Sequence, residues 1–188
     1  MFINKQNDMN PLEIIQKYYP VESEAYHILV THSRSVAEKA LQIARNHPEL
    51  NLDLKFIEEA AMLHDIGIFK CDAPDIDCHG DAPYICHGYL GAELMRSEGF
   101  PEHALVCERH TGTGLSLDMI ENQNLPVPHR DMRPVSWEEQ LICFADKFYS
   151  KTHLDKEKST EKIHKSLAKY GEETVNQFDA WCKFFLGE

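Results

Sequence analysis

A chain of 188 residues, 43% hydrophobic and 27% charged, is long enough to bury its own core, and we expect one globular domain over residues 1–188. Its 31 acidic and 19 basic residues give a net charge of −12, which argues against a nucleic-acid polymer as partner. No run approaches the roughly 18 apolar residues of a membrane helix. Residues 1–10 also lack an apolar segment of signal-peptide length, so we expect a cytoplasmic protein without membrane contact.

The six cysteines are scattered without a CxxC pair, which predicts reduced thiols and not a disulfide framework. Three of them, Cys71, Cys78 and Cys86, lie with His79 in or next to a loop over residues 68–85 that is rich in Asp, Pro and Gly. Their spacings match no usual zinc finger or ribbon, which disfavours a structural zinc ion. Long loops of this kind in compact domains tend to be functional.

Two helices are predicted at the start of the chain. Asn10 followed by Pro11 predicts the N-cap and first turn of a short helix. A longer helical segment then runs from about residue 22 to 46, and His32 lies on its apolar stripe. The other members of that stripe are Val36, Ala40 and Ile43. The imidazole of His32 is therefore predicted to face the core.

The segment 63–67, Leu-His-Asp-Ile-Gly, joins two metal-binding side chains at the end of a helix for which Asp53 is a plausible N-cap. His64 continues the apolar face of that helix, and Asp65 is rotated from it by about 100°, so both can reach one ion. We expect Gly67 to stop the helix in a left-handed conformation. Because a buried Asp needs a partner, the pair is either a satisfied His–Asp pair of the core or part of a metal site.

Two further helices carry histidines on their inner faces. One is predicted to begin at His87, and its glycines, Gly88 and Gly91, suggest close approach of another helix or of a ligand. Pro101 opens the next helix, and His110 lies at its C-terminal end. A Thr-Gly-Thr-Gly turn follows, which would leave the backbone open to a substrate.

Residues 113–135 are predicted to be irregular apart from one helical turn after Ser116, and they are candidates for a lid that carries Arg130 and Arg133. No segment shows the two-residue period of a strand. The fold class predicted from these patterns is therefore all-α.

The last third of the chain adds three helical patterns. Ser136 and Glu139 form a capping box that opens a helix on which Asp146 lies among apolar neighbours, the second carboxylate that needs a partner. Two more helices, split by Gly171, occupy much of residues 152–188, and their apolar stripe predicts a cover for the core.

Six inward-facing side chains of metal-ligand type thus fall on five predicted helices. They are His32, His64, Asp65, His87, His110 and Asp146. Six ligands are too many for one closed tetrahedral ion, and they suit two ions bridged by a carboxylate, with open positions for water and substrate.

With this set the sequence resembles the HD-domain superfamily of metal-dependent phosphohydrolases, and within it the small HDIG proteins. The match covers about residues 26–151. Its motifs, in family order, are the His32 segment, His64-Asp65-Ile66-Gly67, His87-Gly-Tyr-Leu-Gly-Ala-Glu-Leu and Ala145-Asp146-Lys147. The resemblance implies a helical bundle around a central metal site, with residues 152–188 as a C-terminal helical cover.

The resemblance also implies a ligand set. The first divalent ion would be held by His32, His64, Asp65 and Asp146. His87 and His110 would hold the second ion with Asp65 as the bridge, and the metals to consider are Fe, Mn, Co, Ni, Zn and Mg. The second-messenger phosphodiesterase branch has a lysine directly after its HDIG-type motif and a Gly-Tyr-Pro signature. Here Ile68 follows Gly67 and no Gly-Tyr-Pro occurs after His110, so cyclic dinucleotide hydrolysis is not expected.

The expected activity is hydrolysis of a phosphate ester or anhydride in a small, nucleotide-like substrate by a metal-bound hydroxide, with Asp65 as the catalytic residue between the ions. Basic residues near the ligands are candidates for holding phosphate, although each could equally be a solvated surface charge. They are Lys70, Arg109, Lys147 and Arg34. Two alternatives use the same ligands: a diiron oxygenase similar to inositol oxygenase, and a domain that senses a nucleotide without turnover. A homodimer is left open.

Overall fold

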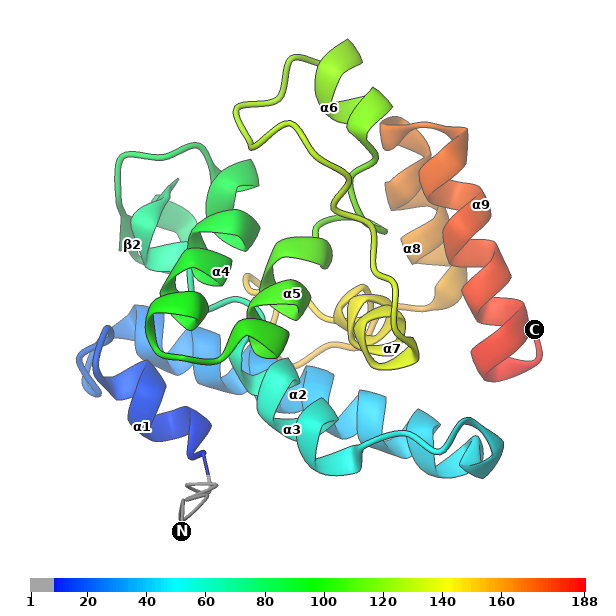
Figure 1. The fold of residues 1–188 in the computed structure, drawn as a ribbon, viewed down its shortest axis with the longest axis horizontal. Coiled ribbons are helices and arrows are strands. Elements are labelled where there is room, and N and C mark those ends of the chain that lie inside the picture. Colours follow the sequence, from blue (N-terminus) through cyan, green and yellow to red (C-terminus); the bar gives the residue numbers. More distant parts are fainter. Residues whose placement is uncertain (1–8) are drawn as a thin grey trace, which may run out of the picture.

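Residues 9–188, the part of the chain described in the computed structural model, form an all-α fold, as the sequence predicts (Figure 1). This part contains nine α-helices, of which α6 is the one that the sequence indicates only as a single turn. The helices are α1 (Pro11–Gln16), α2 (Glu24–Asn46), α3 (Leu54–Leu63), α4 (His87–Ser97), α5 (Pro101–Arg109), α6 (Leu117–Asn122), α7 (Trp137–Asp146), α8 (Thr160–Leu167) and α9 (Glu172–Trp181). The expected lack of a signal peptide concerns residues 1–10, of which 1–8 lie outside the described residues.

The long loop between α3 and α4 contains a small antiparallel sheet. Its two strands, β1 (Asp72–Ala73) and β2 (Cys78–His79), pair with Asp72 opposite His79. Short 3-10 turns flank and separate the strands, so the loop is folded throughout. Two strands of two residues each do not form a layer, and the helices alone build the core.

Polar side chains set where the main helices begin. Asp53 accepts a hydrogen bond from the backbone N–H of Phe56 at 3.0 Å, and Ser136 accepts one from Glu139 at 3.1 Å, as the sequence predicts for both N-caps. The capping box is altered at its second bond, because the Glu139 carboxylate accepts from the N–H of Val135 at 2.9 Å instead of from the N-cap residue itself.

Two apolar clusters meet in the middle of α2. One joins the C-terminal half of α2 to α3, α7, α8 and α9, and the other joins its N-terminal half to α1, α4, α5 and the turn after α3. His32 lies between Val30, which belongs to one cluster, and Val36, which belongs to the other. The predicted ligands therefore gather at the junction of the two clusters.

Gly67 is needed for a different reason from the one expected. Its backbone is right-handed, with φ −81° and ψ −5°, so the prediction of a left-handed helix stop is wrong. A Cβ at this position would lie 2.3 Å from the carbonyl oxygen of His87 and 2.5 Å from the nitrogen of Gly91. Close approach of α4 to the turn after α3 therefore requires the glycine, and it draws His87 toward Asp65. The expectation that the glycines of α4 mark a close helix approach is confirmed.

The C-terminal helices α8 and α9 pack on one side of the core (Figure 1). Phe178 on α9 and Phe185 in the π-helical turn after it are buried, and both pack on the ring of Phe144 on α7. Gly171 separates α8 and its 3-10 extension from α9. Its φ is +109°, a backbone conformation in which a residue with a side chain would be strained.

Replacing Gly67 by Ala is expected to lower the free energy of unfolding by about 1–3 kcal/mol, because the new methyl group overlaps with backbone atoms that cannot rotate away. Gly91→Ala is the matched comparison and should cost less, since its Cβ would lie 3.1 Å from its nearest neighbour, the nitrogen of Gly67. Urea denaturation of the two variants and the wild type measures the loss in the free energy of unfolding, which should be larger for Gly67→Ala than for Gly91→Ala. Equal stability of Gly67→Ala and the wild type would contradict this account of the helix approach.

Candidate metal centre

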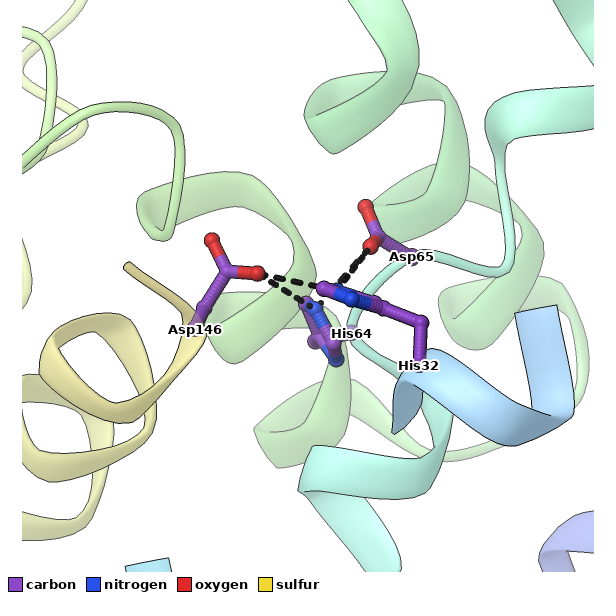
Figure 2. A group of neighbouring side chains, drawn as sticks. All are labelled: His32, His64, Asp65 and Asp146. Atoms are coloured by element: carbon purple, nitrogen blue, oxygen red, sulfur yellow. Dashed lines mark hydrogen bonds and ion pairs between the residues drawn. The ribbon is translucent and has the colours of Figure 1, made fainter. Parts of the chain in front are cut away.

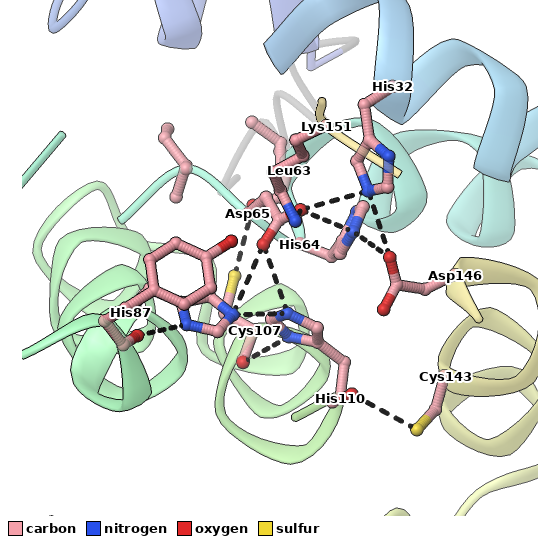
Figure 3. A network of polar contacts seen from close by, with 12 residues as sticks. His32, Leu63, His64, Asp65, His87, Cys107, His110, Cys143, Asp146 and Lys151 are labelled. Atoms are coloured by element: carbon pink, nitrogen blue, oxygen red, sulfur yellow. Dashed lines mark hydrogen bonds and ion pairs between the residues drawn. The ribbon is translucent and has the colours of Figure 1, made fainter. Parts of the chain in front are cut away.

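The six predicted ligands converge on one buried site. One group of ligand atoms, all within 4.8 Å of one another, comes from His32, His64, Asp65 and Asp146 (Figure 2). A second group, defined in the same way, comes from Asp65, His87 and His110 (Figure 3). The two groups share Asp65, which is the arrangement expected from the sequence. Metal binding by these residues stays a prediction.

Most of these side chains lie at helix ends. The sequence pattern predicts that His64 and Asp65 lie on the helix, but His64 is the C-cap of α3 and Asp65 follows it, so both lie just past the last helical residue. The backbone of His64 is still right-handed, which keeps its imidazole on the inner side. His87 begins α4, and His110 is the C-cap of α5. Asp146 ends α7, whereas His32 comes from the middle of α2.

Three of the histidines are oriented in the same way by the backbone. The Nδ1 atoms of His64, His87 and His110 lie 2.6, 2.6 and 2.7 Å from the carbonyl oxygen of the residue three positions earlier. A carbonyl can only accept, so Nδ1 carries the proton, and in the neutral ring Nε2 offers its lone pair to the centre of the site. Histidines that bind metals are commonly held in this manner.

The second group brings acceptor atoms against one another. Nε2 of His87 and Nε2 of His110 are 3.0 Å apart. Oδ1 of Asp65 lies 3.2 Å from Nε2 of His110 and 3.4 Å from Nε2 of His87. Burial lowers the pKa of His87 to about 3, with a further contribution from His110, and burial also lowers the pKa of His110. Because neither ring favours an additional proton, a metal cation is the partner that suits three converging lone pairs.

The first group places imidazole nitrogens against carboxylate oxygens. Nε2 of His32 lies 3.0 Å from Oδ1 of Asp146, and Nε2 of His64 lies 3.0 Å from Oδ2 of Asp65. Nε2 of His64 and Oδ2 of Asp65 are both buried, and neither makes a hydrogen bond of good geometry. Burial by itself would lower the pKa of His64, but the two carboxylates outweigh it and raise the pKa to about 9. The surroundings therefore favour positive charge at this position, and the donor set of imidazoles and carboxylates fits a divalent transition metal.

Two lysines adjoin the carboxylates. Nζ of Lys147 lies 2.8 Å from Oδ2 of Asp146 and donates a hydrogen bond to the carbonyl of His110 at 3.1 Å. Nζ of Lys151 lies 2.6 Å from Oδ2 of Asp65. Burial by itself would raise the pKa of both carboxyl groups, but these lysines and the neighbouring histidines hold each pKa well below its usual range. Both carboxylates are therefore ionised and ready to bind a cation.

Lys151 was not among the residues that the sequence identified as candidates. It follows α7 by five residues and lies in an irregular segment, where helical spacing predicts no direction for a side chain. In the sequence, its position five residues after Asp146, at the end of the recognisable motifs, could have indicated a place near the site. Its side chain is mostly buried, and the figure shows it above Asp65 on the side of the site away from His110 (Figure 3).

The other predicted phosphate-binding residues lie in different surroundings. Lys147 lines a cavity next to the site, whereas Arg34, Lys70 and Arg109 do not line it. Arg34 is exposed on α2, and Nη1 of Arg109 donates to Glu139 at 2.8 Å. Substrate binding by these three residues stays a prediction that their placement does not support.

The arginines of the expected lid are also paired within the protein. Arg130 donates to Glu108, and Arg133 is bound to Asp131 and to Glu173 on α9. The segment itself does border the cavity, through residues such as Leu115 and Met119. It therefore contributes apolar surface to the cavity.

The cavity has a volume of about 960 Å³ and reaches Asp146. Its walls come from the loop before α4, from the segment 111–125 and from residues 146–174. Lys147, Lys151 and Lys158 line it together, in a protein with an overall net charge of −12. Cys71, Cys78 and Cys86 are buried free thiols, and within residues 9–188 none of them belongs to a group of atoms close enough to share an ion.

Comparisons with known proteins give one family and several relatives. The family model of the HD domain matches residues 29–150. An uncharacterized protein of Methanocaldococcus jannaschii is 31% identical over 145 residues, which are 75% of this chain and 78% of the relative. The tRNA (cytidine(56)-2'-O)-methyltransferases of Thermoplasma volcanium and Picrophilus torridus are each 28% identical, over 74% and 71% of this chain. The matched regions make up only 35% and 38% of those two enzymes.

No solved structure shows a significant match to the chain. Among residues 9–188, no helix combines the length and the apolar composition needed to cross a membrane. The family model covers more than half of the chain, and all six converging His and Asp residues lie inside the matched range. On that evidence the chain belongs to the HD-domain family.

Proposed function

We propose that this protein is a metal-dependent phosphohydrolase that cleaves a phosphate ester or anhydride in a small, nucleotide-like molecule. The observation that carries the proposal is the position of Asp65 between two groups of imidazoles. Its Oδ1 faces His87 and His110, and its Oδ2 faces His32 and His64 at 3.2 and 3.0 Å. One divalent ion would be held by His32, His64, Asp65 and Asp146, and a second by Asp65, His87 and His110.

Bound divalent ions would supply positive charge for phosphate oxygens and would activate water as the nucleophile. The chain's own residues fix the geometry around them. Backbone carbonyls hold the rings of His64, His87 and His110, so their Nε2 atoms need no reorganisation on binding. Lys147 is anchored between Asp146 and the carbonyl of His110, and it also lines the cavity.

The charge of the cavity supports an anionic substrate. The protein as a whole is strongly acidic, yet Lys147, Lys151 and Lys158 line the cavity that reaches Asp146, on a different wall from Asp72 and Asp75. The remaining lining includes apolar side chains from the segment 113–125, for example Leu115 and Met119, which suit an organic moiety. A phosphorylated small molecule combines both properties.

The relatives named as tRNA methyltransferases do not change this proposal. The chain spans a little over a third of their length, and their name describes the whole enzyme. A net charge of −12 disfavours an RNA polymer as the substrate here. We therefore keep a small molecule as the substrate and the domain over residues 1–188 as the catalytic unit.

Hydrolysis is expected to require added Mn²⁺, Fe²⁺, Co²⁺ or Mg²⁺ and to proceed without O₂, because water is the only co-substrate. A screen of phosphomonoesters, phosphodiesters and dinucleoside polyphosphates under anaerobic conditions in ¹⁸O-water measures this, with the label expected in the released phosphate or phosphate ester. Turnover only with reduced iron and O₂ would replace the proposal by an HD-type diiron oxygenase. Nucleotide binding without any turnover would leave a sensing domain.

Asp65→Ala is expected to remove both ions, because this carboxylate belongs to both ligand groups. His110→Ala should reduce occupancy mainly at the second position and keep about one ion per chain. His153→Ala, which changes an exposed histidine outside the site, is the control. Elemental analysis of the purified proteins after metal loading measures the number of ions per chain, which should be lowest in Asp65→Ala, intermediate in His110→Ala and unchanged in His153→Ala. Full metal content in Asp65→Ala would show that the ions are bound elsewhere.

A further inference from the structure

Lys158 is a half-buried lysine whose ammonium group makes no ion pair or hydrogen bond within residues 9–188. Its backbone N–H donates to the carbonyl of Phe148 at 2.8 Å, which folds the segment after α7 back against the end of that helix. The side chain lines the same cavity as Lys147 and Lys151. An unpaired ammonium group that is partly removed from water is unfavourable unless a ligand supplies its counter-charge.

The three lysines are not equivalent. Lys147 and Lys151 are each bound to a carboxylate of the metal centre, at 2.8 and 2.6 Å. Lys158 forms no ion pair with either carboxylate. Burial lowers its pKa, the charge of Asp146 acts in the opposite direction, and the charges of Lys147 and Lys151 lower the pKa further. The cavity therefore contains one cationic group that the metal centre does not use.

We propose that Lys158 is a specificity-determining residue that binds a second anionic group of the substrate, a phosphate or a carboxylate, while the phosphate to be cleaved lies at the metal centre. The inference rests on the proposed hydrolase function and adds the substrate class to it. Substrates with two separate anionic groups are favoured over simple monoesters.

Lys158 lies outside the part of the chain that matches the HD-domain family. All six metal-ligand positions lie within the family match of residues 29–150, whereas Lys151, Lys158 and the lining residues of α8 follow it. The C-terminal segment, expected from the sequence only to cover the core, thus also forms one wall of the cavity. Ser166 and Tyr170 add hydroxyl groups to the same wall. Asp72 and Asp75 lie on the wall formed by the loop before α4, where a second anion would be repelled.

The test compares anions that carry one or two charged groups. Orthophosphate, pyrophosphate and 2-phosphoglycolate are titrated calorimetrically into the Mn²⁺-loaded wild type and into Lys158→Met, which keeps the length of the side chain and removes its charge. Pyrophosphate or 2-phosphoglycolate should lose about tenfold more affinity than orthophosphate, the loss expected for one charge-assisted contact. The anion with the larger loss identifies phosphate or carboxylate as the second group.

Lys162→Met removes an exposed lysine of α8 that does not line the cavity, and it should bind all three anions like the wild type. Lys158→Arg should keep the preference. Equal losses for all three anions, or no loss, in Lys158→Met would overturn the proposal. The binding titration needs no turnover, so a wild type that binds pyrophosphate through Lys158 and hydrolyses neither a phosphate ester nor a phosphate anhydride would refute the proposed hydrolase function separately.

Discussion

The burial of one carboxylate among four imidazoles is the constraint on which the rest of this structure depends. Asp65 is inaccessible to solvent, and each of its oxygens faces a different pair of histidines. A carboxylate in such a position is stable only when positive charge lies close by. Lys151 supplies part of that charge in the structure, and the convergence of Nε2 lone pairs shows where further cations fit. The close approach of α4 at Gly67 brings His87 into this arrangement, so the packing of the helices and the chemistry of the site have the same origin.

The molecule separates the candidate metal ligands from the surface that would select a substrate. The ligands come from α2, α5, α7 and the ends of α3 and α4, which pack on one another and carry the family match. The cavity wall comes largely from segments beyond or between these helices, including residues 111–125, the loop before α4 and the C-terminal residues from 151 onward. A fixed site with exchangeable walls can keep one type of chemistry while the substrate changes.

Helical periodicity was sufficient to predict that His32 and Asp146 face the interior. His32 and Asp146 lie on apolar stripes, and the structure places both at the junction of the two clusters. Proximity in sequence was a poor guide for the basic residues. Arg34 is two positions from His32, which turns it by about 200° around the helix, and it is accordingly exposed. The roles of Gly67, Lys151 and Lys158 could not be predicted, because they depend on what lies next to these residues in space and not on any local pattern.

The central claim is that Asp65 bridges two ions. A crystal structure of the protein grown with Mn²⁺, with anomalous diffraction recorded at the manganese edge, tests it most directly. The account predicts two anomalous peaks per chain, one beside Oδ2 of Asp65 next to His32 and His64, and one beside Oδ1 next to His87 and His110. A single peak, or peaks that do not contact Asp65, would contradict the claim.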